Sequence, residues 1–454
     1  MSRDEFRILS TTAILGYGFP IASFEEGMKR DPHLIAVDAG STDPGPYYLG
    51  AGVSFTDRGA VKRDLEIMIR AGVERNILVC IGSAGGSGGE PHLNWNREII
   101  EEIAREQGLH FKLAVIHAEL PKEMVKRELA AGNVLPLDPA PALTDETIDE
   151  TTRIVAQMGI QPFMAAQDNG AQVILAGRAY DPAVFAAPAV AKGYDMGLAT
   201  HLGKILECAA ICAAPGSGAD CMFGYIGEDY FRVEPLSPAR HCTIVSVAAH
   251  TLYEKTDPYI LPGPGGHLDL TRTKFEQETP SIVKVSGSRF VHGDGYAVKL
   301  EGARRIGWRT VSIAGTRDPV MMERMDDIIE GVKERVADNF RGRDLKYHLN
   351  FTIYGRDGVM GRLEPLRERS LSHEYGIIIE AVADTQELAN TICATARSTM
   401  LHYGYEGRRA TAGNLAFPYS PSDFHAGEVY AFSVYHLLKV EDPAAPFPIE
   451  YFDL

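Results

Sequence analysis

Apolar and polar positions along residues 33–178 follow two alternating rhythms. Short, continuous apolar runs predict strands, and the amphipathic stretches of helical period between them predict helices. The expected strands are residues 33–38, 76–81, 111–116, 134–137 and 172–177, and the expected helices are residues 61–72, 96–106, 121–132 and 145–159. Continuous apolar strands separated by helices are typical of a mostly parallel sheet with helices on both faces. We therefore expect a Rossmann-like α/β substrate-binding domain over residues 1–299.

The pattern changes in the last third of the chain. Strands are predicted at residues 308–315, 347–355, 375–383 and 428–438. One helix is predicted to start at Asp318, which precedes a proline, and another at the pair Asp384 and Glu387, which has the spacing of a capping box. The order strand, helix, strand, strand, helix, strand is that of a ferredoxin-like, split βαβ domain. We assign it to residues 300–454, as an α+β domain.

Polar residues follow the predicted parallel strands where a ligand is expected. Ligands of open parallel sheets bind beyond the carboxyl ends of the strands. The residues found there are Asp38, the glycine-rich loop 82–89, His117, Glu119, Arg178 and Asp181. We expect Asp38 to contact a substrate, Arg178 to bind a carboxylate, and Asp181 to act as an acid or base. Turns also select polar residues, so the positions alone leave both interpretations open.

The glycine-rich loop "GSAGGSGG" matches neither a dinucleotide-binding fingerprint nor a Walker A loop. It lies between a predicted strand and a predicted helix, whose first turns could present free N–H groups to an anion. We expect the anionic end of a substrate to contact Gly82, Ser83, Gly85, Gly86 and Gly88. The alternative is a sterically tight crossing of the chain with no ligand.

The segment 199–214 carries the densest set of reactive side chains. His201, Lys204, Cys208 and Cys212 fall on one helical stripe, and Glu207 points about a hundred degrees away from Cys208. An imidazole, an ammonium and a thiol on one face suit proton transfer or nucleophilic work, whereas a core helix with buried cysteines is the plainer interpretation. Two further segments hold acid–base groups next to turns. The first contains His250, Glu254 and Asp257, and the second contains His292 and Glu301.

Composition narrows the classes of partner. The chain of 454 residues has 45 Lys and Arg against 61 Asp and Glu, a net charge of −16. This charge disfavours nucleic acid and anionic membranes as partners. No apolar stretch is long enough to span a membrane, and the first residues make a poor signal peptide, so we expect a cytoplasmic protein. Six sparse cysteines do not form a disulfide scaffold, and their spacing is not that of a zinc site, so we expect no metal.

Several segments together resemble the acyclic terpene utilisation (AtuA-like) family. They are the loop "GSAGGSGG", where the family has Asn-Ala-Gly-Gly, and "AGRAYDPAVFAAP", "HLGKILEC", "HTLYEKTDP", "VKVSGSRF" and "YAVKLEGARRIGWRTVSIAGTRDP". The stretch 402–438 is similar to the branch that accompanies a small separate partner protein. Members carry a compact Gly-His-x-x-Glu-Cys element; here Thr200 replaces the glycine, and His201 and Glu207 stand further apart.

The resemblance implies catabolism of branched or terpenoid acids, often as acyl-CoA thioesters. We expect a hydratase, dehydratase or isomerase in which His201, Glu207 and Asp181 are acid–base groups and Cys208 lines the site. It would need no cofactor, with CoA entering only as part of a substrate, and would be a homo-oligomer. Two alternatives stay open. One is a non-catalytic binding subunit that needs the small partner protein, and the other is a nicotinamide-dependent oxidoreductase, disfavoured by the missing fingerprint.

Overall fold

The computed structural model describes residues 4–40, 44–369 and 371–454, and the chain divides into two compact units. The first unit comprises Met1–Arg304 and Phe432–Leu454, and the second comprises Arg305–Ala431. Two long strands, β15 (Tyr296–Thr316) and β18 (Asp423–Val440), contribute residues to both units. The division into one domain over residues 1–299 and another over residues 300–454 stays a prediction.

A ten-stranded mixed sheet forms the centre of the first unit. The neighbouring strands β1, β2, β3, β7 and β4 run parallel, and the strands on either side of them are antiparallel. In sheet order the strands are β12 (Lys274–Gln277), β13 (Val283–Ser286), β9 (Tyr230–Pro235), β8 (Met222–Ile226), β1 (Phe6–Ser10), β2 (Leu34–Asp38), β3 (Leu78–Gly82), β7 (Val173–Ala176), β4 (Lys112–Ile116) and β19 (Ile449–Asp453). The predicted strands at 33–38, 76–81, 111–116 and 172–177 are therefore confirmed.

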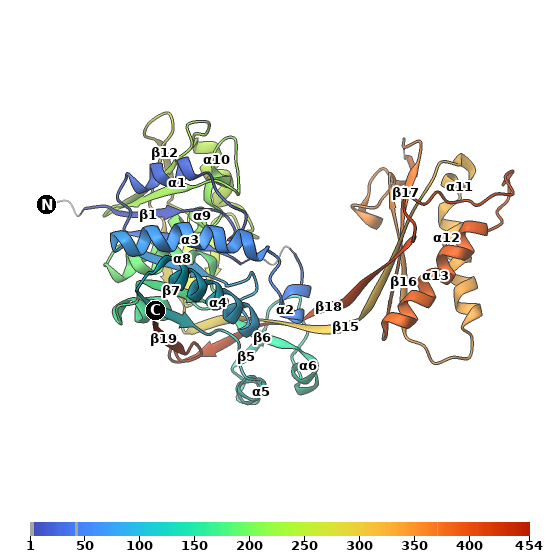
Figure 1. Cartoon of the computed structure of the whole chain (residues 1–454), viewed down its shortest axis with the longest axis horizontal. Helices are drawn as coiled ribbons and strands as arrows, with labels where there is room; N and C mark the ends of the chain where they lie inside the picture. Colours follow the sequence, from blue (N-terminus) through green and yellow to red (C-terminus); the bar gives the residue numbers. More distant parts are fainter. Residues whose placement is uncertain (1–3, 41–43, 370) are drawn as a thin grey trace. The chain divides into compact units, whose positions relative to one another are not determined.

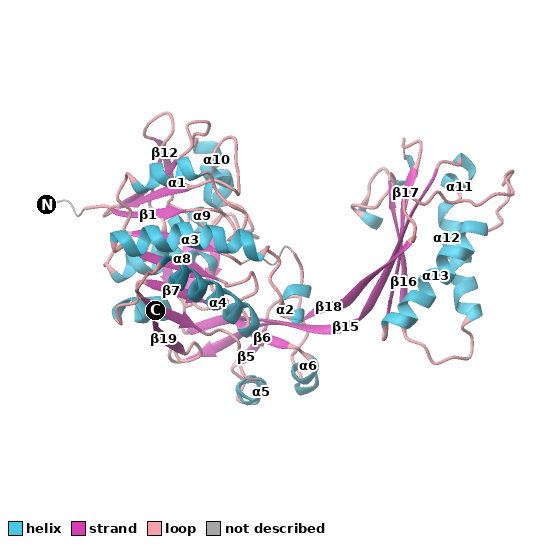
Figure 2. Cartoon of the chain, in the orientation of Figure 1, coloured by secondary structure: helices cyan, strands magenta, loops and turns pink. Residues whose placement is uncertain are grey.

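Helices cover both faces of this sheet, and Figure 2 draws them in cyan against the magenta strands. One face packs against α1 (Ile21–Met28), α3 (Arg58–Arg75) and α4 (Glu90–Gln107), and the other against α7 (Ile160–Asp168), α8 (Asp181–Ala191) and α9 (Met196–Leu206). Successive residues of one strand point to opposite faces, so Val79 and Ile81 join the first core and Cys80 joins the second. This explains why these strands are apolar throughout, and the expected α/β class is confirmed.

Two expectations about residues 134–159 are wrong in part. The predicted helix 145–159 ends early, as α6 (Asp145–Glu150), and is followed by the strand β6 (Arg153–Ala156), which pairs with β15. The β-branched pair Ile154 and Val155 is fully buried there, and strand propensity prevails over helical spacing. The predicted strand 134–137 exists as β5 (Val134–Pro136), but it pairs with β18 instead of joining the parallel strands.

The remaining elements of the first unit are short. A three-stranded antiparallel sheet consists of β10 (Ile260–Gly263), β11 (Gly266–Asp269) and β14 (Arg289–His292). The helices are α2 (Tyr47–Ala51), α5 (Lys122–Ala130), α10 (Ile244–Thr251) and the 3₁₀ helix η1 (Ala209–Cys212). None of the helices in the described part of the chain is long and apolar enough to cross a membrane.

The second unit contains an antiparallel sheet in the order β16 (Tyr347–Tyr354), β17 (Tyr375–Ala383), β15 and β18, which can be followed by colour in Figure 1. Its helices are α11 (Pro319–Glu323), α12 (Met325–Asn339) and α13 (Gln386–His402), with the 3₁₀ helices η2 (Gly361–Leu363) and η3 (Arg367–Arg369). Asp318 caps α11 as predicted, by accepting from the N–H of Met321. At α13 the prediction is wrong by one residue, because Thr385 is the N-cap and accepts from Leu388.

Candidate functional site

The carboxyl ends of β2, β3 and β7 bring together three predicted residues. Asp38 ends β2, Ser83 follows the last residue of β3, and Arg178 follows β7 by two residues. The Oγ of Ser83 accepts from Arg178 Nη1 at 3.2 Å and from the backbone N–H of Ala179 at 3.2 Å. Parallel pairing of the three strands fixes these positions, and the expectation that polar residues gather here holds.

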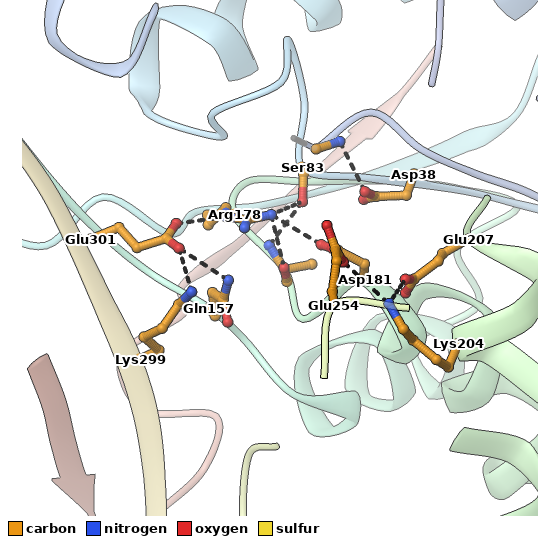
Figure 3. A network of polar contacts seen from close by, with 12 residues as sticks. Asp38, Ser83, Gln157, Arg178, Asp181, Lys204, Glu207, Glu254, Lys299 and Glu301 are labelled. Atoms are coloured by element: carbon orange, nitrogen blue, oxygen red, sulfur yellow. Dashed lines mark hydrogen bonds and ion pairs between the residues drawn. The ribbon is translucent and has the colours of Figure 1, made fainter. Parts of the chain in front are cut away.

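Arg178 is buried and held by two carboxylates (Figure 3). Its Nε lies 2.8 Å from Glu301 Oε2, and its Nη1 lies 3.0 Å from Asp181 Oδ1. Glu301 also accepts from Gln157 Nε2 at 3.2 Å and pairs with Lys299 at 2.7 Å. Burial raises the pKa of Glu301, but the cations Arg178 and Lys299 outweigh burial and lower it to about 2. Two protein carboxylates therefore already occupy the guanidinium that we expected to bind a substrate carboxylate.

Asp38 and Asp181 are carboxyls for which ionisation is costly. The Oδ2 of Asp38 accepts from the N–H of Gly40 at 2.9 Å, while its buried Oδ1 has no hydrogen-bond partner within the described residues. Burial raises the pKa of Asp38 well above its ordinary value, and the carboxylate of Asp181 adds to the rise. Burial also raises the pKa of Asp181, although the cation of Arg178 opposes the change.

A second group of charges lies at the end of α9. Lys204 Nζ is 2.5 Å from Glu207 Oε1 and 3.2 Å from Glu254 Oε2. The helix ends at Leu206 and Glu207 is its C-cap, so the two charges lie on adjacent turns. Burial raises the pKa of Glu207, and Lys204 only partly opposes the rise, to which Asp181 contributes.

The two groups together form one charge network in which carboxyl groups outnumber cations. Figure 3 shows their side chains, which come from the ends of β2 and β7, from α8 and α9, from the segment after α10 and from β15. The network contains the carboxyls of Asp38, Asp181, Glu207, Glu254 and Glu301 and the cations of Arg178, Lys204 and Lys299. Because acids outnumber cations in a buried space, at least one carboxyl is best kept protonated. Glu207 and Asp38, whose pKa values are raised, are the groups that hold a proton most readily.

Polar atoms without partners surround Lys204. In the part of the chain that the structure describes, Glu207 Oε2, the Tyr180 hydroxyl and His250 Nε2 are buried and make no hydrogen bond. Burial raises the pKa of Tyr180, and the nearby carboxyl of Glu207 adds to it. Burial and the charge of Lys204 lower the pKa of His250 to about 4, so its ring is neutral at neutral pH. Beside Tyr180 lies a small cavity of about 10 Å³, lined mainly by apolar side chains such as Ile160, Ala183 and Phe290.

The glycine loop is packed tightly against the protein itself. A Cβ at Gly88 would lie 2.1 Å from the backbone nitrogen of Arg178, and one at Gly86 would lie 2.4 Å from Phe55. One at Gly82 would meet Val184, and one at Gly85 would meet His92. The N–H groups of Ser83, Ala84, Gly86 and Gly88 donate to backbone carbonyls. These contacts account for the missing side chains, while binding of an anion by the loop stays a prediction.

His201 lies apart from the charge network. Its Nδ1 is 2.7 Å from Ser288 Oγ, its Nε2 is 3.0 Å from Thr251 Oγ1, and its ring packs edge-on against Phe231. Burial lowers the pKa of His201 to about 3. Cys208 is half-buried next to Glu207, and burial together with that carboxyl raises its pKa. The structure thus brings Glu207, Lys204 and Cys208 together, but it does not bring His201 to the same place.

His117 and Glu119 form a separate cluster after β4. His117 Nδ1 is 2.7 Å from Glu90 Oε1, and Glu119 Oε2 accepts from the backbone N–H of Glu90 at 2.8 Å. Burial raises the pKa of Glu119. Among the described residues, no group of three or more His, Cys, Asp or Glu side chains is arranged to hold a metal ion.

Sequence reasoning missed some members of the network and undervalued others. Gln157, Tyr180 and Lys299 carried no signal of their own. Glu254 and Glu301 appeared only as acid–base groups next to turns. Their quoted segments, "HTLYEKTDP" and "YAVKLEGARRIGWRTVSIAGTRDP", were nevertheless among those that carried the family resemblance.

Comparison with known proteins adds one finding. A family model described as "Acyclic terpene utilisation family protein AtuA" matches residues 59–218 and 238–422, which is most of the chain. Neither the comparison with curated proteins nor that with solved structures gives a match. The matched ranges include Arg178, Asp181, Lys204, Glu207, Glu254 and Glu301.

Proposed function

Because the chain belongs to the acyclic terpene utilisation family, we propose that it is an enzyme acting on branched or terpenoid carboxylic acids or their acyl-CoA thioesters. The proposed reaction is hydration, dehydration or isomerisation next to the carbonyl group, and CoA takes part only within the substrate. The family implies the use of acyclic terpenes; the acid–base chemistry is our inference from the charge network.

The observation that carries the proposal is the buried pair of Lys204 and Glu207. Its atoms lie 2.5 Å apart, and Glu207 Oε2 makes no hydrogen bond to any residue that the structure describes. A protonated Glu207 is a proton donor, and the Lys204 ammonium beside it stabilises negative charge that develops on a carbonyl oxygen. A low-dielectric surrounding strengthens both effects.

A hydration illustrates the division of work. Water adds its oxygen to the β-carbon of a double bond conjugated to the carbonyl while Asp181 takes one proton from that water. The electrons move onto the carbonyl oxygen, which Lys204 stabilises as an enolate. Glu207 then gives its proton to the α-carbon. Asp181 releases the proton that it took to solvent and Glu207 takes one up, which restores both groups, and dehydration is the same sequence reversed. Arg178 positions Asp181 through the 3.0 Å contact, and Cys208 lines the site.

Turnover of a matched panel tests this function. The panel contains branched 2-enoic acids, branched 3-hydroxy acids and the CoA thioesters of both, and mass spectrometry follows the gain or loss of water and the shift of the double bond. We expect conversion of at least one compound, and about a 10²-fold loss in Glu207→Gln, the usual contribution of a general acid. Glu228→Gln, an exposed change of equal charge, should leave turnover unchanged. No conversion by the unaltered protein, or full turnover by Glu207→Gln, contradicts the proposal.

A second candidate function is a binding subunit that needs a small partner protein. It is favoured by exposed apolar side chains on α10, at its C-cap and on the neighbouring η1, where Val245 is 77%, Leu252 50% and Ile211 44% exposed, respectively. Such side chains are typical of protein–protein contacts when they form a patch. Light scattering of the purified chain, alone and with co-expressed small proteins, distinguishes a homo-oligomer from a complex. Turnover that appears only in a complex would favour this candidate.

For the fold, we propose that the first unit is Rossmann-like and the second ferredoxin-like. Support for the first comes from five parallel strands with a helical layer on each face. Support for the second comes from its four strands and two main helices, in the sheet order β16-β17-β15-β18. The proposed cytoplasmic location follows from the sequence alone.

A further inference from the structure

We propose that the Glu254 carboxylate occupies an anion subsite at Lys204, and that the carboxylate of a small-molecule ligand takes its place. The inference deepens the proposed function, since it assigns the group that the ligand presents to Lys204. It requires equilibrium binding only and no turnover, so the two can fail independently.

Lys204, Glu207 and Glu254 differ in exposure, and the difference favours displacement of Glu254 by a ligand. The side chains of Lys204 and Glu207 are 6% and 4% exposed, whereas that of Glu254 is 49% exposed. Glu254 therefore approaches the buried ammonium from the solvent side. Its oxygen lies 3.2 Å from Lys204 Nζ, whereas the oxygen of Glu207 lies 2.5 Å from it, so Glu254 is the more distant of the two carboxyl groups. An ion pair with one half-exposed partner contributes little and is readily exchanged for another.

The backbone at Glu254 also favours release. Its φ is +59°, in the left-handed region that a residue with a Cβ adopts at a cost. Glu254 follows α10 by three residues and precedes the turn at Asp257, which accepts from the N–H groups of Tyr259 and Ile260. A short segment between a helix and a turn can move without unfolding either neighbour.

Polar groups around Lys204 offer a ligand hydrogen-bonding atoms that Glu254 does not use. His250 Nε2 and the Tyr180 hydroxyl are buried, and neither makes a hydrogen bond to a described residue. The His250 ring stacks on Tyr253 with centroids 5.5 Å apart, and Lys204 Nζ lies 5.0 Å from the Tyr253 ring centroid. A carboxylate brings two oxygens with four lone-pair sites, so it can accept from Lys204 and from a neighbouring O–H or N–H donor at once.

Other charged groups in the network do not offer this exchange. Arg178 is 5% exposed, and its partners Glu301 and Asp181 are 4% and 29% exposed, so an external carboxylate would have to displace an ion that is more buried than Glu254. A buried carboxylate without its partner is costly, and that displacement is unfavourable. Glu254 is the partner of Lys204 that can leave, because its half-exposed carboxylate stays in contact with water.

Equilibrium binding to matched probes tests the inference. Acetate, butyrate, isovalerate and octanoate are titrated by calorimetry into the full-length protein, beside the four corresponding primary amides. In Glu254→Gln the internal competitor is gone, so at least one carboxylate should bind about fivefold tighter, the effect that a weak ion pair can supply. The amides should bind as before, and Lys204→Met should bind no carboxylate. Glu228→Gln, which removes one exposed negative charge elsewhere, should match the unaltered protein.

Three results overturn the inference. The first is a failure of all four carboxylates to bind both the unaltered protein and Glu254→Gln. The second is equal affinity of the two proteins for every carboxylate. The third is an equal gain in affinity for the amides, which would mean that the Glu254→Gln change makes the site more accessible without removing a competing charge. Thermal denaturation of each variant shows that it is folded before binding is interpreted. Turnover lost in Glu207→Gln with unchanged carboxylate binding in Glu254→Gln would leave the enzyme proposal intact and remove this one.

Discussion

The guanidinium Nε of Arg178 lies 2.8 Å from Glu301 Oε2, although the two residues are 123 positions apart in the chain. Both side chains are almost completely buried. This pair connects the carboxyl end of β7 to β15 and holds Arg178 where it can also contact Asp181. Arg178, which we expected to bind a substrate carboxylate, is thus held by carboxylates of the protein.

Glu301→Gln should destabilise the first unit by about 3 kcal/mol at neutral pH, because breaking a buried ion pair strands its partner. The pKa of Glu301 is lowered to about 2 in the folded protein. Its contribution is therefore present above the ordinary glutamate pKa and is lost as the pH falls toward about 2. Urea unfolding at pH 7 and at pH 3 should show a smaller difference between the two proteins at the lower pH. Glu150→Gln, which breaks the exposed pair with Arg304, is the control and should cost under about 1 kcal/mol.

Gly88→Ala should destabilise the protein severely, by about 3 kcal/mol or more, because the added Cβ meets backbone and not a flexible side chain. Gly88 also has a φ of +65°. Gly132 has a similar φ of +78° but open space around it, so Gly132→Ala isolates the backbone effect at about 1 kcal/mol. Equal melting temperatures for the two variants would contradict the tight packing of the loop on Arg178.

His201→Gln separates a catalytic from a structural histidine. Both ring nitrogens are engaged by hydroxyls inside the protein, so we expect a loss of about 1–3 kcal/mol of stability, as for other broken buried hydrogen bonds. Specific activity per folded molecule should stay within a few fold, once a substrate is known. A variant that melts normally but loses about 10²-fold in turnover would instead support the predicted catalytic role.

Glu207→Gln should change how stability depends on pH. Because the folded pKa of Glu207 is raised, its contribution to stability is fully present below the ordinary glutamate pKa and is lost as the pH rises through the raised value. The amide cannot ionise, so the variant should lose less stability than the unaltered protein between pH 6 and pH 9. Thermal melts across this range measure the difference. A parallel decline of both proteins would show that Glu207 ionises without cost.

The sequence predicts the local parts of this site better than its long-range parts. Asp38, Ser83 and Arg178 each follow a continuous apolar strand, and parallel pairing alone brings strand ends together. Lys204 and Glu207 stand three residues apart, a spacing at which helical side chains are neighbours, and Glu207 keeps right-handed helical angles as the C-cap of α9. The spacing therefore allows this pair, but it does not predict that both charges are buried.

Hydrophobic periodicity could not predict the members of the charge network that come from distant parts of the chain. Glu301 lies within β15 and reaches Arg178 only because β15 pairs with β6, a strand that we predicted as helix. Glu254 reaches Lys204 from a turn after α10, and no pattern of spacing predicts which charges a turn presents. Both depend on tertiary contacts that overrule local propensity.

Infrared difference spectroscopy of Glu207 tests the central claim, a buried proton donor beside Lys204, most directly. The spectrum of Glu207→Gln is subtracted from that of the unaltered protein at neutral pH in heavy water, with Glu228→Gln as the exposed reference. We predict that the difference contains the carbonyl band of a protonated carboxyl group, which shifts on deuteration, and that this band disappears as the pH is raised. A difference that contains only the bands of an ionised carboxylate, at every pH where the protein is folded, would contradict the account.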